Sequence, residues 1–389
     1  MKKTKIISPL IKGWNKKETV LNLTRWNENI PQDLQLESSF EETLDKFDNV
    51  VWLGRTGRRE QNATNYYMFN DRDWSEVNWM VNHITLREGE MIEKGYDVKG
   101  VKSFNRNTWV DISRHSNAME GVFEDFEYDL LDFRAQLRGR IAHDPSTKDF
   151  DIDAYFLKLL DQLKKVEENN DSVVVIGKNK EIELDLETVR HFLAFKYVYK
   201  CAKKYRYKDS LSATEIAKII QNSACLLSGS EWVEYRNIQV YVNKNGNYDL
   251  AKWTPVKPSK ILPQMDSLCS WIANENNINP IDKAAIAQAE FVRIHPYFDG
   301  NGRVSRLLAN FILMKNGVPT IKIRYENTIE YFKALNEAIE THNCNTLINM
   351  FNDQVLDSAC KINECLDYIE KNQKKKVEGG AQEDKEKVK

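Results

Sequence analysis

The stretch 295–306 combines residue types that act together in phosphate-transfer chemistry. His295 offers an imidazole that can accept a proton, and Asp299 offers the hard carboxylate oxygen that Mg²⁺ prefers. The Gly-Asn-Gly turn at 300–302 can adopt positive φ, so that successive N–H groups converge on phosphate oxygens. The spacing predicts transfer chemistry on a magnesium-bound polyphosphate.

Two arginines extend this group into the next expected helix. Arg303 opens that helix, so the positive end of the helix dipole faces the same anion. Arg303 and Arg306 are three residues apart and share one helix face, which lets both reach a single phosphate chain. Asn279-Pro280 predicts the start of a helix that runs to His295, and Gly317 predicts the end of the helix after Arg306.

The same stretch resembles the signature of the Fic family, His-Pro-Phe-x-Asp-Gly-Asn-Gly-Arg-x-x-Arg. Eight fixed positions of that signature are present in this chain: His295, Pro296, Asp299, Gly300, Asn301, Gly302, Arg303 and Arg306. Tyr297 stands where the family usually has Phe, and it keeps an aromatic ring at a position that normally packs in the core. Single elements such as Gly-Asn-Gly are common, and the combined spacing is what makes the match specific.

The resemblance implies a protein adenylyltransferase, an enzyme that moves AMP from ATP onto a Ser, Thr or Tyr hydroxyl of a target protein and releases pyrophosphate. It implies His295 as the general base, Asp299 as the Mg²⁺ ligand, and the backbone of the Gly-Asn-Gly turn, with Asn301, as a cradle for the α- and β-phosphates. Arg303 would bind the β-phosphate and Arg306 the γ-phosphate. ATP and Mg²⁺ are therefore the expected substrate and cofactor.

Two further positions bear on the nucleotide. Family members that phosphorylate their targets resemble this signature with Lys in place of Gly302, so nucleotidyl transfer is favoured over kinase activity. Tyr331 opens a segment, 331–338, that is similar to the family segment in which a Tyr lines the pocket for the nucleotide base. Ile339 replaces the Asn often found next, and a buried core position is the alternative for Tyr331.

Residues 116–121 resemble the inhibitory-helix pattern of many Fic proteins: Ser or Thr, three variable residues, Glu, then Gly or Asn. Ser116 and Glu120 would lie on one face of a helix expected over about 111–121, with Gly121 suited to its end. The resemblance implies that Glu120 pairs with Arg306 and denies that guanidinium to the γ-phosphate, since a carboxylate fits the same fork. A surface Glu on an amphipathic helix is the alternative.

An alternating apolar and polar pattern at 238–242, followed by Asn245-Gly246, predicts a β-hairpin. The residues of its first strand are Ile238, Gln239, Val240, Tyr241 and Val242. An exposed strand edge can bind a partner segment through main-chain hydrogen bonds. In proteins that the chain resembles, this hairpin is the flap that holds the target beside the active site, and an ordinary solvent-exposed hairpin is the alternative.

The composition argues against several other classes of protein. The 389 residues carry a net charge of −2, which gives no electrostatic basis for binding nucleic acid. No apolar run is long enough to cross a bilayer, and Ser8 and Pro9 break the basic start before it could act as a signal peptide. The six cysteines include no Cys-x-x-Cys pair, which indicates reduced thiols and a cytoplasmic location.

Apolar periodicity and the resemblance together predict a mainly α fold: a Fic-type helical bundle with a small β-hairpin flap, preceded by a helical N-terminal region. Non-helical stretches are expected at 173–176 and in the flap. The expected divisions are an N-terminal region of unknown role at 1–105, a helical region with the inhibitory helix at 106–205, a Fic catalytic domain at 206–350, a C-terminal helix at 351–370 and a charged, disordered tail at 371–389.

Three alternatives to this function stay open. Some relatives remove AMP from a modified target, with the residue that corresponds to Glu120 orienting water. The scaffold could also take UTP, GTP or a nucleotide-linked choline as donor, because the phosphate-binding turn does not read the base. A non-enzymatic Fic-fold interaction protein would use the flap alone. The partner is a target protein with an acceptor hydroxyl, and self-modification and a homodimer are left open.

Overall fold

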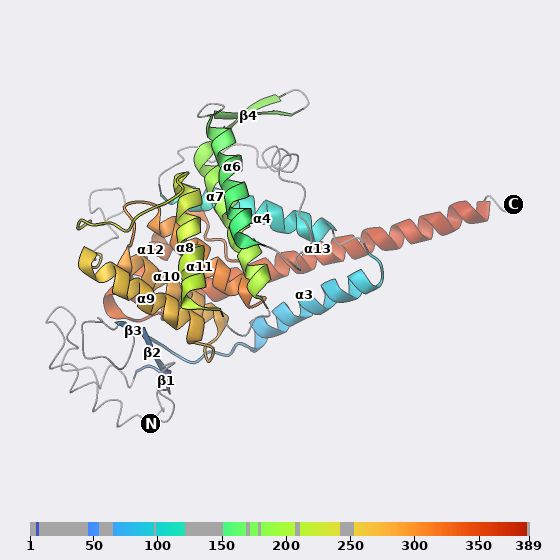
Figure 1. The fold of residues 1–389 in the computed structure, drawn as a ribbon. Coiled ribbons are helices and arrows are strands. Elements are labelled where there is room, and N and C mark those ends of the chain that lie inside the picture. Colours follow the sequence, from blue (N-terminus) through green and yellow to red (C-terminus); the bar gives the residue numbers. More distant parts are fainter. Residues whose placement is uncertain are drawn as a thin grey trace.

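The computed structural model describes residues 5–7, 46–53, 65–96, 99–120, 151–168, 172–177, 180–206, 211–241 and 253–386 (Figure 1). In this part the chain is mainly helical, which confirms the predicted fold class. The helices are α3 (Ser75–Glu93), α4 (Lys99–Ala118), α6 (Ile152–Glu167), α7 (Leu186–Tyr205), α8 (Ala213–Ser228), α9 (Pro258–Asn274), α10 (Pro280–Ile294), α11 (Asn301–Lys315), α12 (Thr328–Thr341) and α13 (Asn345–Glu386), with a 3₁₀ turn, η2, at Tyr325–Asn327.

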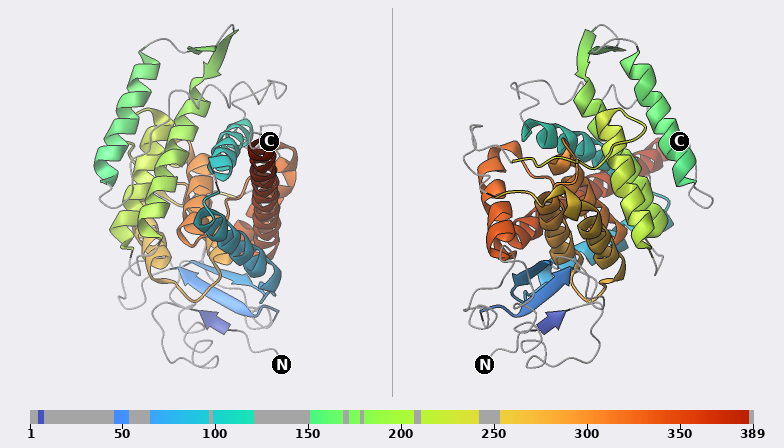
Figure 2. Two further views of the ribbon diagram at one scale, coloured as in Figure 1. Left: turned by 90° about the vertical axis from the view of Figure 1, so that its right-hand side faces the viewer. Right: turned by 60° about the vertical axis from the view of Figure 1, so that its left-hand side comes forward.

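Helices α10 and α11 form the centre of the fold and are joined by the loop 295–300, which carries the signature. The start of α10 confirms the prediction: the Asn279 side chain accepts a 2.8 Å hydrogen bond from the backbone, and Pro280 takes the first helical position. Nearly all of α10 is buried, because α9, α11, α12 and α13 pack around it (Figure 2). Gly317, with φ 77°, ends α11 as predicted. The core therefore holds both ends of the signature loop.

A three-stranded sheet precedes the helices. Its strands lie in the order β1 (Lys5–Ile7), β2 (Asn49–Leu53), β3 (Asn65–Phe69), with β1 parallel to β2 and β2 antiparallel to β3. Residues 1–105 were predicted only as a region of unknown role, so this sheet was not expected. The strands are short and rich in aromatic and β-branched residues, which suits a sheet, but each is too short to show a clear period in the sequence.

Buried polar contacts attach this sheet to α10. Asn65 Nδ2 and Tyr67 Oη donate to Glu290 Oε2 at 2.6 Å and 3.0 Å, and Arg293 Nε donates to the same oxygen at 2.8 Å. Burial disfavours the charge, yet Arg293 and the other donors hold the pKa of Glu290 below its ordinary value. The sheet thereby fixes the last turn of α10, which ends next to His295.

Helices also begin earlier than the sequence predicted. Helix α4 starts at Lys99 rather than near 111, and α3 lies before it, alongside α13 (Figure 2). The buried residues of α3 are Val77, Ile84 and Met91, which recur every seventh position. These three residues form a narrow apolar stripe that is wide enough to pack against one helix, α13. The rest of α3 is more polar, so its amphipathic pattern is weak in the sequence.

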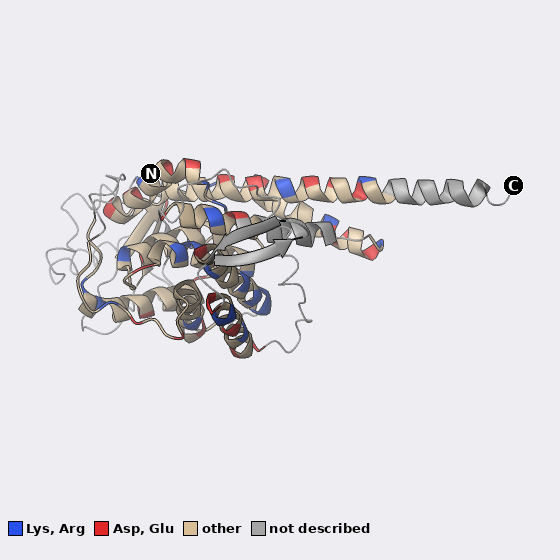
Figure 3. Ribbon diagram, turned by 90° about the horizontal axis from the view of Figure 1, so that it is seen from above, with Lys and Arg blue, Asp and Glu red and all other residues tan. Residues whose placement is uncertain are grey.

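The C-terminal part is a single helix rather than a short helix with a disordered tail. Helix α13 runs over Asn345–Glu386 and extends away from the other helices (Figure 1). Figure 3 shows basic and acidic residues interspersed along its described part. Lys, Glu and Gln are good helix formers, and the two glycines at 379–380 cost only about 1 kcal/mol each in a helix. The prediction of disorder over 371–386 is therefore wrong.

The two predicted non-helical stretches have different outcomes. Residues 173–176 lie in strand β4 (Ser172–Gly177), which pairs antiparallel with β5 (Lys180–Asp185). The prediction of a flap strand is wrong for the flap residues that the structure describes, because 231–241 have no regular secondary structure. Val242 and the Asn245-Gly246 turn lie outside the described residues. None of the helices in the described ranges combines the length and the apolar character that a membrane span needs.

Candidate active site

His295 ends α10 in a left-handed backbone conformation, with φ 53° and ψ 61°. This region is disfavoured for residues with a side chain, and such strain is concentrated at functional sites. A 2.9 Å hydrogen bond from His295 N to Phe291 O ties the residue to the last turn of the helix. The ring of Trp253 lies 5.9 Å away between centroids, edge to face. The fold thus keeps the imidazole at one strained position where α10 meets the signature loop.

The protonation state of His295 suits a general base. Its Nδ1 lies 3.3 Å from Val292 O, and because a carbonyl only accepts, Nδ1 carries the hydrogen and Nε2 keeps its lone pair. Burial, assisted by the charge of Arg236, lowers the pKa of His295 to about 4. The ring is therefore neutral near pH 7 and can accept a proton at Nε2.

Arg236 fixes the backbone around His295, although no sequence motif pointed to it. Its side chain is 2% exposed and donates to the carbonyls of His295 (2.7 Å), Ile238 (3.0 Å), Ile294 (3.3 Å) and Val256. The backbone N–H of Arg236 donates to Pro296 O at 2.8 Å. Because the guanidinium takes the Ile238 carbonyl, this part of the predicted flap strand is bound to a side chain instead of a neighbouring strand.

Arg236→Lys should lower the free energy of unfolding by about 1–3 kcal/mol, as measured by urea denaturation. A lysine keeps the charge but lacks the planar fork, so some of the carbonyls lose their donor. Arg324→Lys is the matched control, because Arg324 is exposed and the change should stay within about 0.5 kcal/mol. Equal stability of the two variants would contradict the role of Arg236.

The loop after His295 is closed by Asn301. Its Nδ2 donates to Tyr297 O at 2.8 Å, and its Oδ1 accepts from Tyr297 N at 2.9 Å. Both polar atoms form hydrogen bonds inside the loop, so this side chain shapes the turn, and its part in a phosphate cradle stays a prediction. Tyr297 is fully buried, which confirms its predicted core position, and its hydroxyl donates to Gln221 Oε1 at 3.2 Å.

Only the first glycine of the turn has the predicted backbone conformation. Gly300 has φ 77° and is the N-cap of α11. Gly302 lies inside α11, so the prediction of a positive φ at Gly302 is wrong. Gly302 is needed for space instead: a Cβ there would lie 2.2 Å from Glu120 Oε1 and 3.1 Å from Arg306 Nη1. The missing side chain leaves room for a carboxylate beside Arg306.

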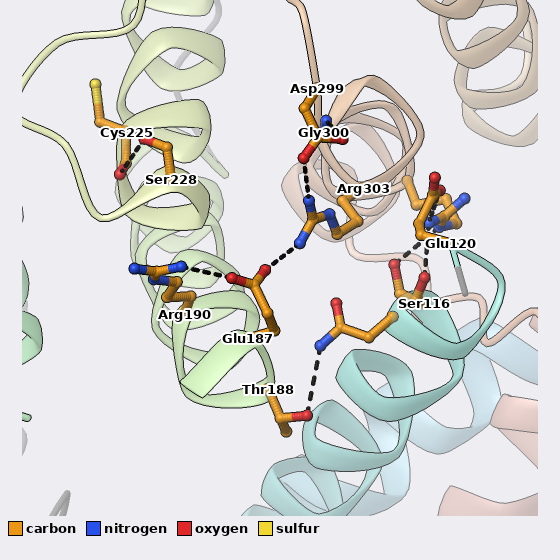
Figure 4. A network of polar contacts seen from close by, with 12 residues as sticks. Ser116, Glu120, Glu187, Thr188, Arg190, Cys225, Ser228, Asp299, Gly300 and Arg303 are labelled. Atoms are coloured by element: carbon orange, nitrogen blue, oxygen red, sulfur yellow. Dashed lines mark hydrogen bonds and ion pairs between the residues drawn. The ribbon is translucent and has the colours of Figure 1, made fainter. Parts of the chain in front are cut away.

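Arg306 is bound by residues at the end of α4. Its Nε donates to Ser116 Oγ at 2.9 Å, and its Nη2 donates to Ser116 O at 2.9 Å and to Glu120 Oε1 at 2.7 Å. Figure 4 shows Ser116 and Glu120 side by side at this point. Burial opposes the charge of Arg306, but Glu120 contributes enough to raise the pKa of Arg306. A carboxylate thus occupies one side of this guanidinium.

The segment that was predicted to form an inhibitory helix over about 111–121 is placed differently. Helix α4 ends at Ala118, and Glu120 lies in the following turn, where its N–H donates to Asn117 O at 2.9 Å. Ser116 and Glu120 therefore reach Arg306 from a helix end and a turn, not from one helical face. Gly121 lies outside the described residues.

Arg303 pairs with Glu187, which no motif indicated, and its Nη2 lies 3.2 Å from Asp299 Oδ2. The Asp299 side chain is 88% exposed, and its Oδ1 accepts from Gly300 N at 2.6 Å. One exposed carboxylate beside an N–H-rich turn fits Mg²⁺, which combines one or two carboxylates with phosphate oxygens and water. In the described part of the chain, no cluster of three or more His, Cys, Asp or Glu could hold a metal by itself.

Two buried arginine nitrogens are left without a partner. Arg303 Nε and Arg306 Nη1 make no hydrogen bond within the ranges that the structure describes. An unpaired buried donor on a charged group is unfavourable by about 1–3 kcal/mol or more. A polyphosphate has enough oxygens to accept from both arginines, so the site suits such an anion.

Comparison with known proteins agrees with this geometry. Residues 210–313, which include the signature loop, match the family model described as Fic/DOC family. The chain carries a domain of the Fic/DOC family. The matched residues contain α8, α9, α10 and most of α11, and thus the residues from Arg236 to Arg306, while Ser116, Glu120 and Glu187 lie before them.

Individual relatives cover the chain in part. Protein adenylyltransferase fic-1 of Caenorhabditis elegans is 33% identical over 143 residues, which are 36% of this chain and 26% of that protein. A probable protein adenylyltransferase of Aquifex aeolicus is 29% identical over 183 residues, 45% of this chain and 52% of that protein. A Fic domain containing signaling protein from Bacteroides thetaiotaomicron has a solved structure that covers 74% of this chain and 97% of that chain, at 17% identity and a TM-score of 0.48. The chain spans about a quarter of the nematode protein and about half of the Aquifex protein.

Tyr331 lies beyond the matched Fic domain and is fully buried. Gln288 Nε2 donates to its hydroxyl at 2.7 Å. In this arrangement Tyr331 is a core residue, which is the alternative that the sequence left open, and a contact with the nucleotide base stays a prediction.

The flap segment of the Fic domain exposes apolar side chains although it is not a strand. Ile238 is 59% exposed and Tyr241 is 75% exposed. Gln239 Nε2 donates to Val240 O at 3.1 Å and to Pro255 O at 2.9 Å, which holds the segment against the chain that precedes α9. A role of these residues in binding a target stays a prediction.

Proposed function

We propose that the protein moves AMP from ATP onto a Ser, Thr or Tyr hydroxyl of a target protein and releases pyrophosphate. One observation carries this proposal: a neutral imidazole with a bare Nε2 stands at the start of the loop whose far end presents two buried arginines with unpaired nitrogens. A base and a polyphosphate-binding group on one loop suit transfer from a nucleoside triphosphate. The names of the relatives, protein adenylyltransferases, agree with it.

The chemistry assigns each residue a step. The acceptor hydroxyl gives its proton to His295 Nε2 and attacks the α-phosphorus, and the bond from that phosphorus to the bridging oxygen of the β-phosphate breaks. Arg303 binds the β-phosphate and Arg306 the γ-phosphate, which orients pyrophosphate as the leaving group. Mg²⁺, with Asp299 as its ligand, would supply charge neutralisation on the phosphates when bound.

Glu120 sets the resting rate in this scheme. Its carboxylate binds Arg306 in the position that the γ-phosphate needs, and both groups suit the same guanidinium fork. ATP would then enter with its γ-phosphate displaced and its α-phosphate poorly aligned for attack. The contact between Glu120 and Arg306 supports the proposal that Glu120 inhibits the transferase.

The position of the label in ATP tests the proposed reaction. The purified chain carrying Glu120→Gly, in which the carboxylate on Arg306 is gone, is incubated with Mg²⁺ and with ATP labelled either at the α- or at the γ-phosphate, and protein-bound label is measured. We expect label from the α-position only, and mass spectrometry should find an added adenylyl group. Label from the γ-position would indicate a kinase, and nucleotide binding without any label would indicate an interaction protein.

Removal of AMP is a second candidate, because the charge of Glu120 acts on His295 as well as on Arg306. A carboxylate near the imidazole could orient a water molecule toward a modified hydroxyl. Loss of AMP from a pre-modified target, incubated with the wild-type chain, would establish this direction. GTP, UTP and a nucleotide-linked choline, added as competitors, test the choice of donor.

The proposed setting is the cytoplasm, where the six cysteines remain thiols; the structure places none of them in a disulfide. The proposed partner is a target protein that presents a hydroxyl to the flap segment. Self-modification and a homodimer belong to the same proposal, and intact-mass measurement and light scattering test them.

A further inference from the structure

Arg303 is anchored by Glu187, a residue that belongs to none of the motifs. Arg303 Nη1 donates to Glu187 Oε2, and Arg303 Nη2 lies 3.2 Å from Asp299 Oδ2. The side chains are exposed to very different extents, 7% for Arg303, 26% for Glu187 and 88% for Asp299. Because Asp299 is almost fully in solvent, Glu187 provides the sheltered contact that holds this guanidinium.

Glu187 is itself held in place. It is the second residue of α7, where the N-terminal end of a helix favours a carboxylate. Its other oxygen accepts from Arg190 Nη1, and Arg190 binds Glu167 Oε1 through Nη2 at 2.8 Å and through Nε at 3.2 Å. Figure 4 shows Glu187 between Arg190 and Arg303. A line of alternating charges therefore runs from α6 through the first turn of α7 to Arg303.

The backbone that carries Glu187 is packed against α4. Asn117 Nδ2 donates to Thr188 Oγ1 at 3.4 Å, and His191 Nδ1 lies 3.0 Å from Ser113 Oγ. All four side chains are buried. The first turn of α7 cannot shift without breaking these contacts, so Glu187 offers Arg303 a fixed acceptor.

Glu187 leaves donors of Arg303 free for a ligand. A guanidinium has five N–H groups, of which Glu187 and Asp299 each take one on a terminal nitrogen, and Nε is buried without a partner in the described ranges. Arg306 differs, because Glu120 already occupies its Nη2. A phosphate can therefore bind Arg303 while Glu187 stays bound, whereas at Arg306 it can take Nη2 only by displacing Glu120.

We infer that Glu187 is a positioning residue that holds Arg303 ready for the β-phosphate of a bound nucleotide. This inference rests on the proposed function, in which Arg303 takes that phosphate. A free arginine side chain has many rotamers, and ordering it during binding weakens affinity. Glu187 holds the Arg303 side chain in one conformation before the nucleotide binds. Ordering one long side chain in advance should raise the affinity for the nucleotide about tenfold.

The test compares two substitutions that remove the same charge. Glu187→Gln keeps an oxygen next to Arg303, whereas Glu187→Ala removes the contact entirely. Both are made in the full chain that also carries Glu120→Gly, and ADP and AMP are titrated calorimetrically with Mg²⁺ present. ADP should bind Glu187→Ala about tenfold more weakly than Glu187→Gln, and AMP, which has no β-phosphate, should bind both alike.

Two controls separate positioning from a general structural role. In the Arg303→Ala background, Glu187→Ala and Glu187→Gln should bind ADP equally, because the group to be positioned is gone. Glu167→Gln removes the charge of the carboxylate that binds Arg190 and does not contact Arg303. This variant should bind ADP with the same affinity as the chain that carries Glu120→Gly alone.

The outcomes that contradict the inference are distinct from those that contradict the proposed function. Equal ADP affinity of Glu187→Ala and Glu187→Gln, or a difference that persists without Arg303, would overturn the positioning role alone. Weaker AMP binding by the same factor would overturn it too, since the β-phosphate would then not be involved. If neither nucleotide binds the parent protein, the proposed function and this inference both fail.

Discussion

Glu120→Gly should raise the transfer of AMP by about a hundredfold, measured as label from α-labelled ATP on a target or on the chain itself. In the structure Glu120 Oε1 lies 2.7 Å from Arg306 Nη2, so the guanidinium is occupied before any nucleotide arrives. Glycine removes the carboxylate, and ATP can then bind Arg306 with its α-phosphate aligned for attack. A misplacement of about 1 Å costs about 10²-fold in rate, which sets the expected size.

The same substitution should make the protein less stable while it becomes more active. Arg306 is 5% exposed, and without Glu120 it loses its carboxylate partner and keeps the contacts to Ser116, so the free energy of unfolding should fall by about 1–3 kcal/mol. Added ATP should restore stability, because a phosphate replaces the carboxylate. Glu120→Gln, which keeps the shape without the charge, should be activated less. An unchanged rate in Glu120→Gly, with ATP shown to bind, would remove the inhibitory role.

The parts of the site that are close together in the sequence could be predicted from it. The helix start at Asn279-Pro280 and the positive φ of Gly300 follow from local chemistry, because the capping side chain and the missing Cβ act within a few residues. The pair of Glu120 and Arg306 was expected for a different reason, the resemblance to a family, since spacing alone does not place residues so far apart in contact.

Contacts between distant residues without a motif were missed. Glu187 and Arg303 are 116 positions apart, and nothing in either neighbourhood specifies the pairing. The only local signal was an acidic residue in the first turn of a helix with an arginine three positions later, which is common on protein surfaces. Arg236 was missed because its partners are backbone carbonyls, which leave no trace in the side-chain pattern.

The wrong expectations about the fold also concern tertiary context. The strand β3 exists because Asn65 and Tyr67 find Glu290 on α10, and five residues by themselves show too little pattern. Helix α13 is continuous because its first half packs on other helices and the charged second half continues from a helix already formed. Sequence composition alone favoured disorder there, since it does not include that starting helix.

His295→Ala should abolish transfer, with a loss of at least about 10²–10⁴-fold, while the affinity for ATP stays nearly the same. In the proposed mechanism the imidazole accepts the proton of the attacking hydroxyl and does not bind the phosphates, so the loss should be in kcat and not in nucleotide binding. The measurement is made in the Glu120→Gly background, where the rate is high enough for a large loss to be seen. Full residual activity would refute the role of base.

His342→Ala is the matched control for this substitution. His342 also ends a helix with positive φ, 59°, is also largely buried, and has a pKa lowered to about 4, mainly by burial. Its Nδ1 lies 3.0 Å from Tyr66 O, so it shares with His295 a contact to a backbone carbonyl, but it lies outside the signature. The two variants should change stability similarly, and only His295→Ala should lose transfer.

The dependence of kcat/KM on pH should show the lowered pKa of His295 directly. Its ordinary value is 6.5, and burial lowers it to about 4, so the base form persists through the range in which an exposed histidine becomes protonated. The acid limb of the profile should therefore have its midpoint near pH 4.

The stability of the protein should also fall as the pH falls. Between pH 6.5 and 4 the unfolded chain binds a proton at this histidine and the folded chain does not, so protonation favours the unfolded chain in that window. Rates below pH 5 must accordingly be corrected for the folded fraction, measured by circular dichroism on the same samples. A midpoint near 6.5 after that correction would mean that the base is an exposed group, and His295 in its buried position would not be it.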